Sequence, residues 1–276
     1  MRLFLLTALT MTAFAANSVL NRMAVGPGDA DPASFAAIRT GAGASLLCIL
    51  VLLRGGSLPV LHRDRVLGAG ALALYMVGFS TAYLSLDAGL GALLLFGVVQ
   101  IVMFCWNAFT GQPPKPVQLA GAGVAFAGLV IVLWPGPTAQ VSAAGAALMI
   151  AAGVGWAIYT LAGRSATDPL ATTAGNFFWC LPLTAIALAF APELAITSRG
   201  LALAVLSGAV TSGLGYALWY QIIPALGPSR AAVVQLSVPV IAIAAGAVLL
   251  AEPAGLRLLL GTVFVLGGIA LALRGK

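Results

Sequence analysis

Aromatic side chains recur at helical spacing in two apolar stretches of this sequence, in an arrangement suited to holding a planar organic molecule. In the first stretch the spacing is i, i+4, i+8, and in the second it is i, i+3, i+4, so each set would form a stripe along one helix face. Two facing stripes would line a cavity with rings, phenol hydroxyls and an indole N–H. The alternative for each aromatic residue is ordinary core packing. The two stripes consist of Tyr75, Phe79 and Tyr83, and of Tyr216, Trp219 and Tyr220.

Two amide side chains interrupt other apolar stretches. Gln100 lies four residues after Phe96 and would share its helix face, and Gln235 stands two residues before Ser237. A carboxamide without a partner in hydrocarbon costs about 2–7 kcal/mol, so each must face protein, water or a bound molecule. Two interpretations of Gln100 remain open: it contacts a substrate, or it forms a hydrogen bond that joins two helices.

Three more aromatic residues and two prolines complete the candidate site. Trp156, Tyr159 and Trp179 can stack on a planar molecule while an N–H or O–H group bonds its polar end. Pro182 and Pro239 stand inside apolar stretches, where a proline leaves a carbonyl without its donor and bends the helix. We expect both prolines to act as hinges beside a polar space. Asparagines that could line the same space are Asn17, Asn21 and Asn176.

The chain that positions these residues is too apolar for a water-soluble globule. Of its 276 residues, 61% are hydrophobic and 7% are charged, and the mean hydropathy is +1.08. This composition predicts an all-α integral membrane protein surrounded by the lipid bilayer. The formal charge of +6 comes from basic residues scattered singly, which favours orientation in a bilayer over binding of nucleic acid. The three cysteines stand apart and form no metal or redox motif.

Charges, prolines and loop residues divide the chain into ten apolar segments of bilayer-spanning length. The first segment also resembles a signal peptide, but it has a counterpart in the second half of the chain, so we expect it to remain as a helix. Lys and Arg predominate on one side of this arrangement, which places both termini in the cytoplasm. We therefore expect a multi-pass protein of a bacterial inner membrane. The expected segments are 3–21, 33–53, 66–86, 89–110, 117–134, 142–163, 169–190, 200–223, 228–250 and 256–273.

The two halves of the chain resemble each other at an offset of 137 to 142 residues. Each half holds five segments, an odd number, so the second copy must be inverted relative to the first. We therefore expect one five-helix repeat at 1–137 and an inverted repeat at 138–276, which could rock about a shared central site. The matching positions include Asp31-Pro32 with Asp168-Pro169, Gly121 with Gly261, and Gly128 with Gly268.

This plan resembles the EamA branch of the drug/metabolite transporter superfamily. The resemblance rests on Arg39 early in the second segment (AAIRTGAGASLL), on LLAEP at the end of the ninth, and on the glycine-rich tenth (LLLGTVFVLGGIALAL). It covers essentially the whole chain. Within that branch, the size and the aromatic placement are similar to those of the bacterial aromatic amino-acid exporters called YddG.

Arg39 is the one charged residue that we expect inside a segment. Such a residue either receives the carboxylate of a bound molecule, or it reaches the interface or pairs with an acid such as Asp31 or Asp87. Because the resemblance places an arginine there whatever the substrate, the sequence favours a structural role for Arg39.

No carboxylate is expected deep in a segment, and the sequence contains no P-loop and no metalloprotease motif, so we expect neither an enzyme nor a bound cofactor or metal. We expect a secondary transporter that exports small metabolites, namely aromatic and other neutral amino acids, by alternating access around a central cavity. The alternatives are a passive channel and a membrane scaffold subunit without transport. The sequence leaves the oligomeric state open.

Overall fold

Helices make up the regular structure of this protein. The computed structural model describes residues 1–57, 64–109, 115–133, 141–164, 166–191, 193–235 and 237–274. Within them, seven helical stretches are long and apolar enough to cross a membrane, and three shorter helices are also apolar. With the composition, this confirms an all-α membrane protein. The elements are α1 (Arg2–Val25), α2 (Pro32–Leu53), α3 (Asp64–Ala82), α4 (Ala88–Phe109), α5 (Pro116–Leu133), α6 (Ala143–Gly163), α7 (Pro169–Ala189), α8 (Ser198–Leu206), the π-helix η1 (Ser207–Leu214), α9 (Gly215–Gln235), α10 (Ser237–Leu250) and α11 (Leu256–Arg274).

Helices α2 and α7 begin with the same Asp-Pro pair. In each, the aspartate accepts a hydrogen bond from the backbone N–H three residues on, at 2.9 Å for Asp31 and 3.1 Å for Asp168, and a proline occupies the first helical position. Each aspartate also holds a distant part of the chain. Asp31 accepts a second bond from the N–H of Ala195 at 3.0 Å, and Asp168 forms an ion pair with Arg54 at the end of α2. The caps therefore fix both the start of a helix and its neighbour.

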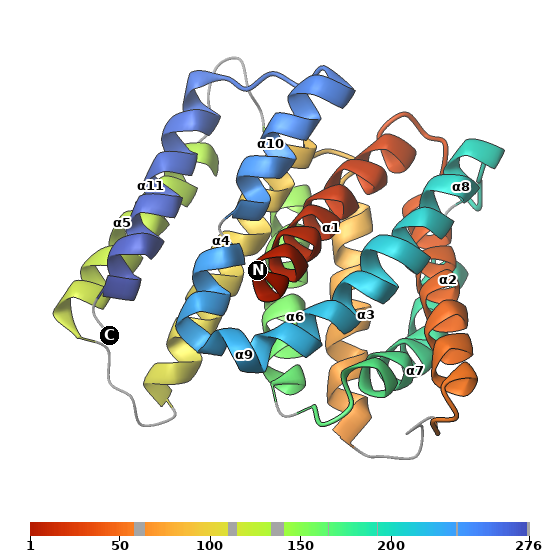
Figure 1. The fold of residues 1–276 in the computed structure, drawn as a ribbon. Coiled ribbons are helices and arrows are strands. Elements are labelled where there is room, and N and C mark those ends of the chain that lie inside the picture. Colours follow the sequence, from red (N-terminus) through yellow and green to blue (C-terminus); the bar gives the residue numbers. More distant parts are fainter. Residues whose placement is uncertain are drawn as a thin grey trace.

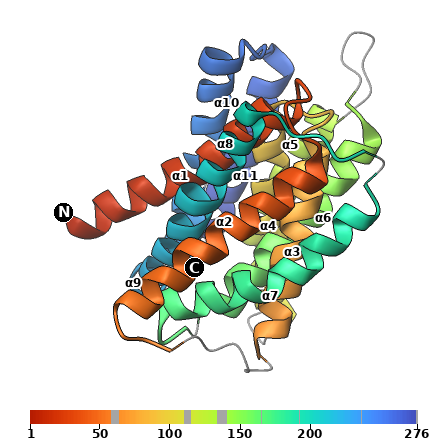
Figure 2. The ribbon, with the colours of Figure 1, turned by 90° about the vertical axis from the view of Figure 1, so that its right-hand side faces the viewer.

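The helices pack in pairs that join the first half of the chain to the second. Helix α5 lies along α11 at one edge of the bundle, and α2 packs against α7 near the opposite edge (Figure 1). Between these edges, α1 packs against α8, η1 and α9, α3 against α6, and α4 against α6 and α10. Figure 2 shows α2, α7 and α8 on the face turned away from α5 and α11.

The ninth expected segment corresponds to the last part of α9 and to α10. Helix α9 continues through 224–227, which were expected as a loop, and its ribbon changes direction along its length (Figure 1). Helix α10 is described from Ser237, so Pro239 is the third of its described residues. Position 236, which joins α9 to α10, lies outside the described residues, so a bend at Pro239 stays a prediction.

Pro182 does stand inside α7, with its ring exposed. The expected boundary between 137 and 138 lies outside the described residues.

Glycines allow the backbones of α5 and α11 to touch. A Cβ atom at Gly268 would lie 2.3 Å from the backbone nitrogen of Ala125, and one at Gly121 would lie 2.4 Å from that of Ala272. In contrast, a Cβ at the adjacent Gly267 would meet no atom within 4 Å. The contact thus depends on particular glycines, as in close-packed membrane helices generally.

We predict that Gly268→Ala destabilises the protein and that Gly267→Ala does not. The new methyl group at Gly268 must push α11 away from α5, and such overpacking costs about 1–3 kcal/mol. The measurement is the thermal unfolding midpoint of each purified variant in detergent. Equal midpoints for the two variants would contradict the close backbone contact.

Candidate functional site

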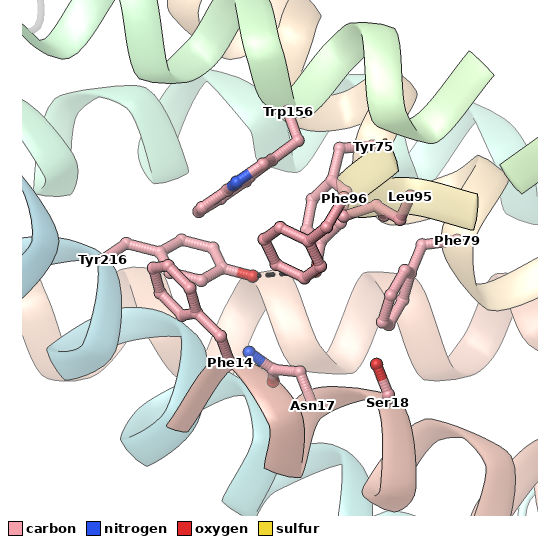
Figure 3. A pocket seen from close by; sticks show the side chains of 9 residues that line it. All are labelled: Phe14, Asn17, Ser18, Tyr75, Phe79, Leu95, Phe96, Trp156 and Tyr216. Atoms are coloured by element: carbon pink, nitrogen blue, oxygen red, sulfur yellow. Dashed lines mark hydrogen bonds between the residues drawn. The ribbon is translucent and has the colours of Figure 1, made fainter. Parts of the chain in front are cut away.

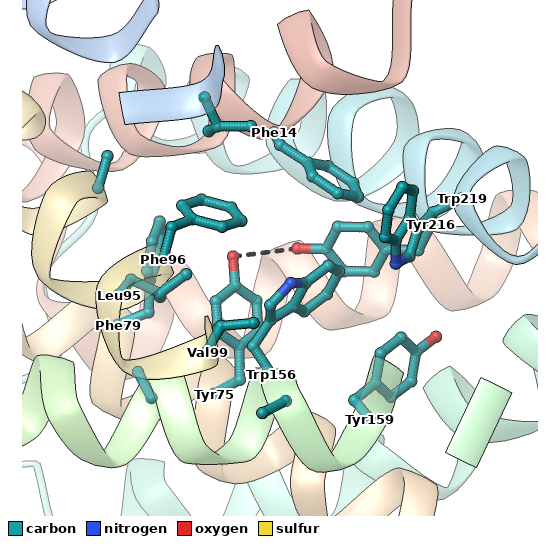
Figure 4. Packing of buried hydrophobic residues seen from close by; sticks show 14 of the residues in the cluster. Phe14, Tyr75, Phe79, Leu95, Phe96, Val99, Trp156, Tyr159, Tyr216 and Trp219 are labelled. Carbon is teal, nitrogen blue, oxygen red and sulfur yellow. Dashed lines mark hydrogen bonds between the residues drawn. The ribbon is translucent and has the colours of Figure 1, made fainter. Parts of the chain in front are cut away.

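Five aromatic rings from four helices meet at the centre of the bundle (Figure 4). The rings of Trp156 and Tyr216 have centroids 4.7 Å apart, Phe14 stands edge-on to Trp156 at 5.1 Å, and Tyr75 lies 5.1 Å from Trp156. Phe79 extends this group, 5.0 Å from Tyr75. All five side chains are buried. The group joins α1, α3, α6 and α9.

A small cavity lies between these rings (Figure 3). Its volume is about 10 Å³, which is the room that one water molecule needs. The structure therefore represents a closed form, in which no amino acid fits between the rings. Residues expected from the sequence that line the cavity are Asn17, Tyr75, Phe79, Phe96, Trp156 and Tyr216; its other walls are Phe14, Ser18 and Leu95.

Most of the other expected site residues are buried around the cavity without lining it. Gln235 supports the site from behind, because its Oε1 accepts a hydrogen bond from Nε1 of Trp156 at 3.4 Å and its Nε2 donates to the carbonyl of Ala231 at 3.2 Å. Ser237 is exposed, and its hydroxyl donates to the Val234 carbonyl at 2.7 Å. The buried residues that do not line the cavity are Tyr83, Gln100, Tyr159, Trp219, Tyr220 and Gln235.

Trp179 lies apart from this group. Its side chain is 40% exposed and stands edge-on to Phe178 at 6.1 Å. On α7 the inward face carries Asn176, Phe177 and Cys180, so a residue at position 179 projects to the outside of the bundle. The expectation that Trp179 lines the central cavity is therefore not met.

Arg39 is fully buried and held by hydroxyl groups. Its Nε donates to Ser212 Oγ at 2.8 Å, and its Nη2 donates to the hydroxyl oxygens of Tyr75 at 3.0 Å and Tyr216 at 2.7 Å. The guanidinium carbon lies 5.3 Å from the ring centre of Tyr75 and 5.1 Å from that of Phe79. Its Nη1 has no hydrogen-bond partner among the described residues. Arg39 thus stands directly behind three side chains of the cavity wall.

The acids proposed from the sequence as partners of Arg39 are engaged elsewhere. Asp31 caps α2, and Asp87 forms an ion pair with Arg22 at 3.5 Å. No ion pair within the described part of the chain includes Arg39.

The π-helix η1 supplies a polar support that the sequence analysis missed. Oδ1 of Asn17 accepts hydrogen bonds from the hydroxyls of Ser207, Thr211 and Ser212 at 2.9, 2.5 and 3.1 Å, and its Nδ2 donates to the Thr211 carbonyl at 3.2 Å. Ser212 thereby connects Asn17 to Arg39. The i→i+5 bonding of a π-helix brings positions 207 and 212 to one side. The sequence feature that could have indicated this support is the run SGAVTSGL, which is rich in hydroxyl groups within an apolar stretch.

A second polar group, which we name the Arg22 cluster, lies at the end of α1. Arg22 donates from Nη1 to the Tyr83 carbonyl at 2.9 Å, and it pairs with Asp87 and Glu252, both at 3.5 Å. The Glu252 carboxylate also accepts from the N–H of Ala88, the first residue of α4, at 2.9 Å. Burial raises the pKa of Glu252 above its usual value, although Ala88 and Arg22 act in the opposite direction. The cluster joins the ends of α1, α3 and α10 to the start of α4.

Comparison with known proteins gives consistent results. A model of the EamA-like transporter family matches residues 143–274. An uncharacterized protein of Pseudomonas aeruginosa is 47% identical over 274 residues, covering 99% of this chain and 94% of its own. An uncharacterized transporter of Archaeoglobus fulgidus is 27% identical over 258 residues, covering 89% of this chain and 90% of its own. A crystal structure with 22% identity shares the fold with a TM-score of 0.69, over 97% of this chain and 96% of that one.

We predict that Asn17→Ala destabilises the protein more than Asn21→Ala does. Oδ1 of Asn17 accepts three hydroxyl bonds, whereas Oδ1 of Asn21 has no partner among the described residues. Loss of Asn17 leaves buried hydroxyls unpaired, at a cost of about 1–3 kcal/mol. Thermal unfolding of both variants in detergent measures the difference, and a larger loss for Asn21→Ala would contradict the described network.

Proposed function

The chain belongs to the EamA-like transporter family, and from this membership we propose that it exports aromatic and other neutral amino acids across a bacterial inner membrane. As a family member it is a multi-pass membrane transporter of small molecules. The observation that carries the finer proposal is the buried cavity at the bundle centre, whose walls are mainly aromatic with an amide and hydroxyls between the rings. Rings suit the stacking of an aromatic side chain, and the polar groups suit its amino-acid end.

The closed cavity favours a carrier over a passive pore. A pore needs a continuous passage, whereas the central rings here leave room for about one water molecule. A substrate must therefore open the site to enter and open it again to leave. Alternating access supplies such a cycle, in which the cavity opens to one side of the membrane at a time.

We propose that the two inverted repeats, 1–137 and 138–276, move against each other during this cycle. The helix packing supports the proposal. When each helix is replaced by its counterpart in the other repeat, the same pairs of helices are found packed together. The packing of α3 on α6 corresponds to that of η1 and α9 on α1, and the packing of α2 on η1 corresponds to that of α7 on α3. Likewise, α4 on α6 corresponds to α10 on α1.

Ion pairs link the proposed repeats at both ends of the bundle. At one end Arg22 of the first repeat pairs with Glu252 of the second, and Asp29 pairs with Arg199; at the other end Arg54 pairs with Asp168. The Arg22 cluster is coupled to the cavity, because Tyr83 packs edge-on against the cavity residue Phe79 at 4.8 Å. We propose that opening on each side breaks the pair on that side.

Counterflow in proteoliposomes tests the proposed function. Vesicles loaded with unlabelled phenylalanine are expected to accumulate labelled phenylalanine saturably, and aspartate should compete weakly. Linear uptake would indicate a pore, and no uptake across a broad panel of amino acids and metabolites would favour a scaffold subunit.

We predict that Trp156→Leu reduces counterflow and that Trp179→Leu does not. Trp156 lines the cavity, whereas Trp179 faces the outside of the bundle. Loss of one stacking ring should lower the rate about three- to tenfold. Both rates are normalised to the amount of protein inserted in the vesicles, and a larger loss for Trp179→Leu would contradict the assignment of the site.

We predict that Arg22→Gln opens the cavity on the side of the Arg22 cluster. A cysteine placed at the cavity residue Ser18, in a chain with its native cysteines replaced, reports this opening through its labelling by a membrane-impermeant thiol reagent. Labelling from that side should become several-fold faster, and Arg54→Gln should not have this effect. Labelling is compared in intact cells and inverted vesicles. Unchanged rates for Arg22→Gln would contradict its role in closure.

A further inference from the structure

The positive charge of Arg39 lacks a counter-charge in the closed protein. A buried ion is costly unless it is paired and fully hydrogen-bonded, and proteins seldom leave one otherwise. The carboxylates whose side chains the structure describes form no ion pair with Arg39, and its Nη1 has no hydrogen-bond partner among the described residues. The aromatic rings over the guanidinium offset part of the cost. The site is thus prepared for an anion that is not part of this chain.

The hydroxyls of Tyr75 and Tyr216 together provide one hydrogen-bond donor for that anion. Both oxygens accept hydrogen bonds from Arg39, which can only donate. One of the two hydroxyl protons lies between the oxygens, with Tyr216 donating to Tyr75 at 3.1 Å. The other proton, on Tyr75 in this arrangement, has no hydrogen-bond acceptor shown within the described structure. Because a cation polarises the oxygen that carries it, this proton is a strengthened donor.

The geometry places this donor at the cavity. Tyr75 and Tyr216 both line the cavity, a dashed line joins their hydroxyls in Figure 4, and Arg39 donates to both hydroxyl oxygens. A carboxylate between the rings would accept the free O–H bond and lie close to the guanidinium charge. Outward movement of either tyrosine on opening would also expose Nη1 for a direct bond.

We propose that Arg39, Tyr75 and Tyr216 form the binding site for the substrate carboxylate, and that this site makes a free carboxylate the main requirement for transport. The inference rests on the proposed function, and it replaces the structural role that the sequence favoured for Arg39. A role limited to joining helices would not distinguish between ligands with and without a carboxylate.

The same site predicts weak recognition of the amino group. No described carboxylate lines the cavity, and Oδ1 of Asn17 already accepts three hydrogen bonds. An ammonium group is left with ring faces, whose attraction for a cation is modest. An aromatic acid without an amino group should therefore bind, whereas the corresponding amines should not.

Ligand-induced thermal stabilisation of the purified protein tests this inference without depending on transport. The ligands are 3-phenylpropionate, phenylalaninamide and phenethylamine, which share a phenyl ring and differ in charge. We expect 3-phenylpropionate to stabilise the wild type at concentrations at least about tenfold below those needed for either amine, as a charge-assisted hydrogen bond implies. Equal stabilisation by the acid and the amines would overturn the inference.

Two variants assign the effect to the site. Tyr75→Phe keeps the ring and removes the hydroxyl, and it should weaken binding of 3-phenylpropionate about tenfold while leaving the response to phenylalaninamide unchanged. Tyr159→Phe is the matched control, because its hydroxyl is buried without a described partner and lies outside the cavity wall. An unchanged affinity in Tyr75→Phe, or an equal loss in the control, would overturn the assignment.

Arg39→Gln and Arg39→Lys extend this test where the variant proteins remain folded. Both should lose the preference for the acid, with Arg39→Lys keeping part of it because the charge remains. Absence of counterflow in the wild type would contradict the proposed function. The preference for the acid over the amines is tested separately, by the stabilisation measurements alone.

Discussion

The burial of one guanidinium without an acid partner determines how the centre of this protein is built. Arg39 needs acceptors from several directions, and they come from three helices: Ser212 of η1, Tyr75 of α3 and Tyr216 of α9. The backbones must also be close, since a Cβ atom at Gly208 of η1 would lie 2.2 Å from the carbonyl oxygen of Arg39. Satisfying one charge thus brings together elements that are far apart in the sequence. The cavity is the small space that remains in front of them.

Helical periodicity made part of this site predictable. The spacing of Tyr75 and Phe79 places both on one face of α3, and the structure shows that this face is buried in the bundle. The same reasoning was insufficient for Trp179, because spacing alone does not say which face of α7 is inward. Its inward face follows only from the burial of Asn176 and Phe177.

Local departures of the backbone from the expected α-helices and loops were harder to predict. In η1, the π-helical spacing aligns Ser207 with Ser212, which an α-helical reading would place on different faces. At 224–227 the sequence predicted a loop because proline and glycine are typical loop residues, whereas α9 continues there as a helix. Of these two departures, η1 borders the site through Ser212. A pattern based on ideal helices identifies such regions as unusual without giving their geometry.

The Arg22–Glu252 ion pair is more deeply buried than the Arg54–Asp168 pair at the opposite end of the bundle. The side chains of Arg22 and Glu252 are 25% and 11% exposed, whereas those of Arg54 and Asp168 are 40% and 47% exposed. Separating a partly buried pair leaves charges in a poorly hydrated setting, while water replaces the partners of an exposed pair at little cost. Glu252, in the second half of the chain, also accepts a hydrogen bond from the first backbone N–H of α4, in the first half. Separation of the two halves at this end would leave that N–H without its acceptor. Without a bound substrate, the protein should therefore open at the Arg54 end far more often than at the Arg22 end.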